Sequence, residues 1–161
     1  MIRVDRRLTI SSLREEAFES ASGLIVASIE VSMPGYYPPG VIAALQKGNS
    51  PANVAARQSK QDDFLATLGG QPVGVLGIKR NEIGHLFVAH DAAGRGVGRY
   101  LIDFAASRFT AAGHRDMVVM SSLNAVGFYA RCDCVVEREG SFTVGGGLPL
   151  RYGWMRAPLE R

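Results

Sequence analysis

A glycine-rich segment near the middle of the chain carries the residues best suited to bind an anion. Gly94, Gly96 and Gly98 alternate directly before a stretch with helical periodicity. Glycine lets the backbone approach a bulky anion and turn its N–H groups toward it, and a helix start adds partial positive charge. Arg95 and Arg99 flank the glycines, and guanidinium groups suit phosphate oxygens. The segment predicts a pyrophosphate-binding loop, with an ordinary glycine-rich turn as the alternative.

The spacing of these glycines argues against two common nucleotide-binding motifs. The dinucleotide motif Gly-x-Gly-x-x-Gly fails because Arg99 stands at its final glycine, and no Gly-Lys-Ser/Thr follows as in nucleoside-triphosphate loops. The loop also follows three strand-like runs with short connections, which predict an antiparallel meander rather than the first crossover of a dinucleotide-binding fold. Dinucleotides and nucleoside triphosphates are therefore disfavoured as ligands.

The elements around this loop have recognisable patterns. Residues 3–10 have a strand pattern, and Ser12 with Glu15 matches a capping box that would begin the following helix. Gly69-Gly70 between two apolar runs predicts a hairpin, and residues 102–112 show the period of an amphipathic helix. The further strands are expected at 64–68, 72–79, 82–88, 117–120, 135–138 and 152–157, and the further helices at 41–47, 53–61 and 124–131.

A second segment, Ser122-Leu123-Asn124-Ala125-Val126-Gly127-Phe128-Tyr129, lies one expected helix and one expected strand beyond the loop. Together with the loop residues 93–98, it resembles the signature of the GNAT superfamily of acyl-CoA-dependent N-acetyltransferases. The resemblance is good over residues 64–140, and in the rest of the chain only the order of the expected helices and strands matches. It departs at Ala93, where the family has Gln or Arg, at His90, where proline is common, and at Asp133-Cys134 in place of Gly-Phe.

The resemblance implies a fold and a cofactor site. The fold would be α/β in one domain over residues 1–161, with a mixed, mostly antiparallel sheet of six to seven strands flanked by helices and the pyrophosphate loop after the fourth strand. Acetyl-CoA would be the cosubstrate, with its pantetheine arm along the strand before the loop and beside Asn124. Asn124 has a helix N-cap as its alternative role. The implied cofactor-binding residues are Phe87, Val88, Gly94, Arg95, Gly96, Val97, Gly98, Arg99, Asn124 and Phe128.

Acetyl transfer to an amine sets two chemical requirements that point to candidate catalytic residues. An amine with a pKa near 10.4 is mostly protonated at pH 7, so a base assists. Glu82 lies six residues before Val88, on the same strand face by period-two counting, and His85 is the alternative base. A proton donor assists the departure of the thiolate, and the resemblance implies that Tyr129 is this donor. The structural alternatives are a solvated carboxylate for Glu82, a packed ring for His85 and a core aromatic residue for Tyr129.

Composition limits the partners. Lys and Arg total 18 against 15 Asp and Glu, for a net charge of +3, which suits an anionic small ligand and does not demand nucleic acid. Cys132 and Cys134 have no second pair to complete a zinc site, so no metal is expected. The chain has no long apolar run and no signal-peptide pattern at its start, which predicts a cytoplasmic protein without membrane contact.

Three function classes remain open at this stage. The first is an N-acetyltransferase acting on a small-molecule or peptide amine, and the second is a non-catalytic acyl-CoA-binding or sensing module, which would need neither Tyr129 nor Glu82. The third is a nucleic-acid-binding domain, against which the scattered basic residues argue. The resemblance also allows a homodimer, and the amine acceptor has no readable motif.

Overall fold

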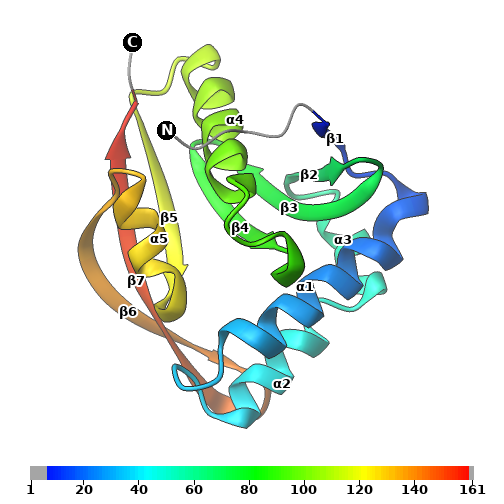
Figure 1. Cartoon of the computed structure of the whole chain (residues 1–161). Helices are drawn as coiled ribbons and strands as arrows, with labels where there is room; N and C mark the ends of the chain where they lie inside the picture. The colour runs from blue at the N-terminus through cyan, green and yellow to red at the C-terminus, as the bar shows by residue number, and fades with distance from the viewer. Residues whose placement is uncertain (1–6, 160–161) are drawn as a thin grey trace.

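The computed structural model describes residues 7–159 as a seven-stranded sheet with helices on both faces (Figure 1). The strand order is β1-β2-β3-β4-β5-β7-β6. All neighbouring strands are antiparallel except β4 and β5, which are parallel. The predicted mixed, mostly antiparallel sheet is confirmed. The strands are β1 (Leu8–Ser12), β2 (Asp62–Leu68), β3 (Gln71–Lys79), β4 (Glu82–Val88), β5 (Asp116–Ser122), β6 (Val135–Val144) and β7 (Leu148–Pro158).

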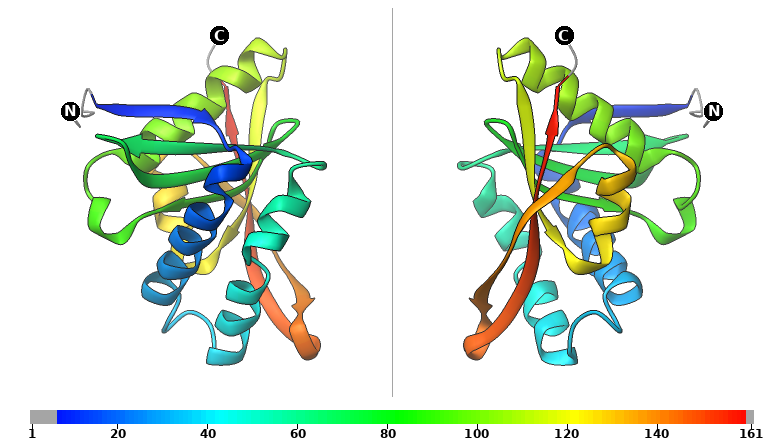
Figure 2. Two further views of the ribbon diagram at one scale, coloured as in Figure 1. Left: turned by 90° about the vertical axis from the view of Figure 1, so that its right-hand side faces the viewer. Right: turned by 90° about the vertical axis from the view of Figure 1, so that its left-hand side faces the viewer.

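The helices divide the hydrophobic core into two clusters, one on each side of the sheet. On one side α4 and α5 cover β3, β4 and β5, and on the other α1, α2 and α3 pack over β3 and β4 and reach the β6–β7 hairpin (Figure 2). Both cysteines are buried in the first cluster, as expected for small apolar side chains. The helices are α1 (Phe18–Ser32), α2 (Pro39–Lys47), α3 (Pro51–Arg57), α4 (Val97–Ala111) and α5 (Val126–Arg131).

The first strand and helix differ from the sequence prediction. Of the expected strand 3–10, residues 3–6 lie outside the described residues, and β1 continues to Ser12, which pairs with Phe64. The predicted capping box is therefore wrong, because Ser12 is held by strand pairing. A short 3-10 turn at Glu15–Ala17 follows, and α1 begins only at Phe18.

Local turn chemistry explains most of the correctly placed elements. Gly69 and Gly70 have φ angles of +58° and +83°, the left-handed geometry that a tight hairpin requires. The Ser50 side chain accepts a hydrogen bond from the N–H of Asn53 at 3.2 Å and caps α3. The hairpin of β6 and β7 is longer than predicted, because its paired strands extend well past the apolar runs.

Candidate active site

The glycine-rich loop is a cradle of unpaired backbone N–H groups. After a 3-10 turn at His90–Ala92, Gly94 and Gly96 both have φ angles of +79°, and Gly96 is the N-cap of α4. The first backbone hydrogen bond into the helix runs from the N–H of Tyr100 to the Gly96 carbonyl, at 3.0 Å. Within residues 7–159, the N–H groups of residues 94–99 have no backbone acceptor. A helix N-terminus with such free donors binds phosphate groups.

The side chains of the loop serve different purposes. Val97 is buried in the core, so only its backbone faces the loop. A Cβ on Gly98 would lie 3.0 Å from two ring carbons of Phe128, so this glycine lets α4 and α5 pack closely. Arg99 is turned aside, with Nε 3.3 Å from an Asp103 carboxylate oxygen. Arg95 is exposed and has no ion pair among the described residues, which leaves its charge free for a phosphate.

Strands β4 and β5 diverge immediately after they meet. They pair only at Glu82 with Val118 and at Ile83 with Val119. Beyond that point the β5 side of β4 has no strand partner within the described chain, so its backbone groups are free to bind a ligand. Two adjoining cavities of about 230 and 340 Å³ fill the gap and share Leu86, Phe87 and Ser122 as lining residues. One groove thus begins beside the helix α4 N-terminus and passes between the two strands.

Asn124 contributes an unpaired polar atom to the part of the groove next to the loop. Its side-chain carbonyl oxygen is buried and has no hydrogen-bond partner among the described residues, and the residue lines the smaller cavity with Val88 and Phe128. A buried polar atom without a partner costs free energy. The alternative role as an N-cap is not seen, since Asn124 lies inside the 3-10 turn Leu123–Ala125 and caps neither this turn nor α5. Its free oxygen fits an amide N–H of a ligand.

Tyr129 lies on α5 and lines the larger cavity. The side chain is 4% exposed, and its hydroxyl forms no hydrogen bond within residues 7–159. Burial, reinforced by the nearby thiols of Cys134 and Cys132, raises the pKa of Tyr129 well above 10. The phenol therefore stays protonated at every physiological pH and faces the cavity as a hydrogen-bond donor.

Glu82 lines the same cavity, but the predicted face of its strand is wrong. His85 pairs with Gly77 on β3, whereas Ile83 pairs with the very next residue, Ile78, so Gly84 is an extra residue in β4. Such a bulge reverses the alternation of side chains. Glu82 consequently shares a face with His85 and Phe87, not with Val88.

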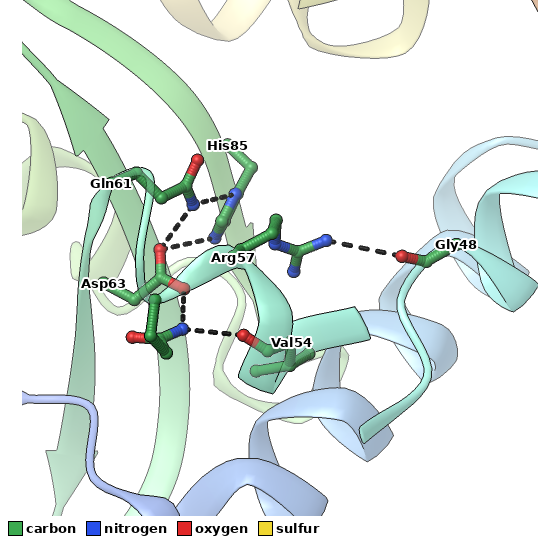
Figure 3. A network of polar contacts seen from close by, with 7 residues as sticks. Gly48, Val54, Arg57, Gln61, Asp63 and His85 are labelled. Carbon is green, nitrogen blue, oxygen red and sulfur yellow. Dashed lines mark hydrogen bonds and ion pairs between the residues drawn. The ribbon is translucent and has the colours of Figure 1, made fainter. Parts of the chain in front are cut away.

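His85 lines the same cavity and belongs to a buried polar network (Figure 3). Its Nε2 lies 3.4 Å from Asp63 Oδ1, and its Nδ1 lies 3.3 Å from the amide nitrogen of Gln61. The same Gln61 nitrogen donates to Asp63 Oδ1 at 2.6 Å, and the Gln58 amide donates to Oδ2 at 2.6 Å. Burial lowers the pKa of His85 to about 4. The ring is neutral, and its Nε2 atom has no hydrogen-bond partner among the described residues. Its low pKa makes it a weak base, which disfavours His85 in that role.

The sequence leaves two interpretations of Tyr36-Tyr37-Pro38-Pro39, an ordered turn and the rim of an acceptor pocket, and the structure shows that Tyr37 links distant segments. Its buried hydroxyl donates to the Arg151 carbonyl at 2.6 Å and accepts from the N–H of Leu123 at 2.8 Å. These bonds tie the segment after α1 to β7 and to the turn that leads into α5. Tyr37 thereby holds the turn that contains Asn124.

Comparison with known proteins shows the family to which this chain belongs. The family described as "Acetyltransferase (GNAT) domain" matches residues 37–146, more than half of the chain. The chain belongs to the GNAT acetyltransferase family. No curated protein sequence matches significantly. The family resemblance and the GNAT-like fold inferred from the sequence are confirmed.

Solved structures of GNAT proteins superpose along nearly the whole chain. A GCN5-related N-acetyltransferase from Rhodopseudomonas palustris is 30% identical, with a TM-score of 0.90 over 98% of this chain and 99% of that one. The PaiA N-acetyltransferase of Thermoplasma acidophilum, solved with coenzyme A, is 19% identical, with a TM-score of 0.73 over 94% and 98%. YncA of Salmonella typhimurium, solved with acetyl-CoA, is 16% identical, with a TM-score of 0.65 over 97% and 96%. The last two comparisons support the fold alone.

No three His, Cys, Asp or Glu side chains within residues 7–159 are grouped so that they could bind a metal ion. None of the helices in this part of the chain has the length and apolar character needed to cross a bilayer.

Proposed function

We propose that this GNAT protein transfers an acetyl group from acetyl-CoA to a primary amine by direct attack in a ternary complex. The observation that carries the proposal is the continuous groove between β4 and β5. At one end it reaches Gly98 in the first turn of α4, beside the free N–H groups of residues 94–99, and at the other it contains Tyr129 and Glu82. The complexes of PaiA with coenzyme A and of YncA with acetyl-CoA support this choice of cosubstrate.

The residues along the groove fit the successive parts of acetyl-CoA. The N–H groups around Gly94 and Gly96, with Arg95 beside them, would hold the pyrophosphate. The free backbone groups of Phe87 and Val88 and the unpaired oxygen of Asn124 would hold the amides of the pantetheine arm. A backbone N–H of β4 would polarise the thioester carbonyl, since such donors stabilise the charge that develops on oxygen during acyl transfer.

The remaining residues would manage the two proton requirements. The amine nitrogen forms a bond to the acetyl carbon while the carbon–sulfur bond breaks, and the amine proton passes to Glu82 directly or through water. Tyr129 donates a hydrogen bond to the departing thiolate. Because a phenol, with a pKa near 10, is intrinsically a weaker acid than a thiol, with a pKa of about 8.5, and burial raises both pKa values, complete proton transfer is unfavourable. Tyr129 thus stabilises the thiolate mainly by a hydrogen bond.

The proposal is tested by following free thiol release from acetyl-CoA with a panel of amino acids, polyamines, aminoglycosides and peptides. Thiol release that depends on an amine, together with an acetylated product found by mass spectrometry, is the expected result. Binding of acetyl-CoA measured by calorimetry, without transfer to any member of the panel, would instead favour the acyl-CoA-binding module.

A further inference from the structure

The side chain of Arg57, at the end of α3, is incompletely paired (Figure 3). Its Nη1 atom donates to the Gly48 carbonyl at 3.4 Å. Its Nε and Nη2 atoms are buried and have no hydrogen-bond partner within the described chain. These two nitrogens form one edge of the planar guanidinium group, the edge that binds both oxygens of a carboxylate at once. The structure therefore holds an unused two-donor edge in a buried position.

Asp63 does not occupy this edge. Its Oδ1 and Oδ2 atoms accept hydrogen bonds from Gln61 and Gln58, and Oδ1 lies 3.4 Å from Nε2 of the neutral His85 ring. Within residues 7–159 no carboxylate lies within 4.0 Å of the Arg57 guanidinium. Asp63 acts on Arg57 only through its electric field, and the Nε and Nη2 donors of Arg57 remain without a partner among the described residues.

Arg57 lines the same cavity of about 340 Å³ as the proposed catalytic residues. The lining contains two charged side chains at neutral pH, Arg57 and Glu82, because His85 is neutral. The rest of the lining is largely apolar and aromatic, including Leu45, Leu150 and Phe142. A volume near the lower end of the range for ligand pockets suits a small acceptor.

We infer that Arg57 binds the carboxylate of a small amino-acid-like acceptor, whose amine then lies toward Glu82 and Tyr129. This inference rests on the proposed acetyl transfer. A polyamine without a carboxylate would leave the Nε and Nη2 donors of Arg57 unpaired and would bring further positive charge beside them. Both effects disfavour the binding of polyamines. A phosphate group fits less well, since no second arginine or lysine lines the cavity to bind its remaining oxygens.

The test compares acceptors that differ by one carboxylate. L-Methionine, L-phenylalanine and γ-aminobutyrate are paired with 3-(methylthio)propylamine, 2-phenylethylamine and propylamine, and spermidine and 2-aminoethylphosphonate are added. We expect kcat/KM at least about tenfold higher for one or more of the amino acids than for the decarboxylated partner, since a charge-assisted bidentate contact is lost. Equal or faster acetylation of the simple amines, spermidine or the phosphonate would overturn the inference.

Variants of Arg57 test whether this side chain causes the preference for acceptors that carry a carboxylate. Arg57→Gln should raise the KM of the amino acid about 10- to 100-fold and leave the decarboxylated amine and acetyl-CoA unaffected. Arg57→Lys, which keeps the charge without the planar edge, should recover part of the loss, and Arg14→Gln at an exposed site controls for net charge. An equal loss on both members of a pair would show a merely structural role.

A second measurement separates this inference from the proposed function. Calorimetric titration of the same amino acids and amines into protein saturated with coenzyme A requires no turnover. Binding that depends on the carboxylate in the wild type and is lost in Arg57→Gln would support the anchor even if no acetyl transfer occurs. No carboxylate-dependent binding to the wild-type protein would overturn the inference, whatever the outcome of the thiol assay.

Discussion

Replacing Tyr129 by phenylalanine tests whether the buried phenol acts in the reaction or only fills the core. The substitution removes one oxygen atom that has no hydrogen-bond partner within residues 7–159. The ring, its packing and its edge-on contact with Phe128 at 5.2 Å between centroids stay in place. We therefore expect the thermal stability of the variant and its affinity for acetyl-CoA to remain unchanged.

The size of the rate loss follows from the environment of the phenol. Since a phenol is intrinsically a weaker acid than a thiol and burial keeps Tyr129 protonated, its contribution is a hydrogen bond to a charged group and not a complete proton transfer. Such a bond contributes about 1.5–3 kcal/mol. This free energy corresponds to a decrease of roughly 10- to 150-fold in kcat, with little change in the KM for acetyl-CoA.

The assay is steady-state thiol release with a saturating acceptor, accompanied by single-turnover measurement to show that chemistry limits the rate. Tyr100→Phe is the matched control, because Tyr100 lies on α4 and does not line the groove. A kcat within about threefold of the wild type in Tyr129→Phe, with chemistry limiting, would refute the role of the phenol. A loss of acetyl-CoA affinity would assign Tyr129 to binding instead.

Three further predictions concern the loop, the arm site and the polar network. Gly96→Asp should weaken acetyl-CoA binding in calorimetry far more than Gly96→Asn, because both side chains tolerate the φ of +79° but only Asp repels phosphate; equal losses would contradict the cradle. Asn124→Ala should raise the KM for acetyl-CoA roughly tenfold without loss of stability, because its oxygen is already unpaired; an unchanged KM would remove Asn124 from the site. The pKa of His85 is about 4 in the folded state and 6.5 in the unfolded state. The contribution of the neutral ring to the free energy of unfolding is therefore complete above about pH 6.5. It decreases as the pH falls toward 4, by about 2 kcal/mol at pH 5. Urea unfolding at pH 7 and pH 5 should therefore show a smaller pH dependence in His85→Gln than in the wild type, and identical dependence would show that His85 is not the group.

Features determined by neighbouring residues were predictable from the sequence. Gly94 and Gly96 take the left-handed conformation because glycine adopts it without steric cost, and the helix that follows begins at Val97, ahead of the apolar period that starts at Ile102. The Gly69-Gly70 hairpin and the cap of α3 by Ser50 are equally local. These elements were sufficient to place the glycine-rich loop after the fourth strand.

Features that depend on contacts between distant segments were not predictable. Arg57, Asp63 and His85 come from α3, β2 and β4, and only the pairing of β2 with β3 and of β3 with β4 brings them together. The capping box at Ser12 failed for the same kind of reason, since pairing with β2 overrides a local capping pattern. Period-two counting failed at Gly84, because a bulge leaves no fixed sequence pattern.

The bulge at Gly84 explains how one strand serves both the core and the cavity. Ile83 is fully buried in the cluster beneath α4, on the same face as Leu86 and Val88. In a regular strand Glu82 would share that face, and its carboxylate would point into an apolar core at a large cost in free energy. The extra residue places Ile83 in the core and Glu82 on the opposite face, in the cavity with Arg57. The irregularity that defeated the sequence count is therefore what allows the proposed base and the proposed carboxylate anchor to face one acceptor.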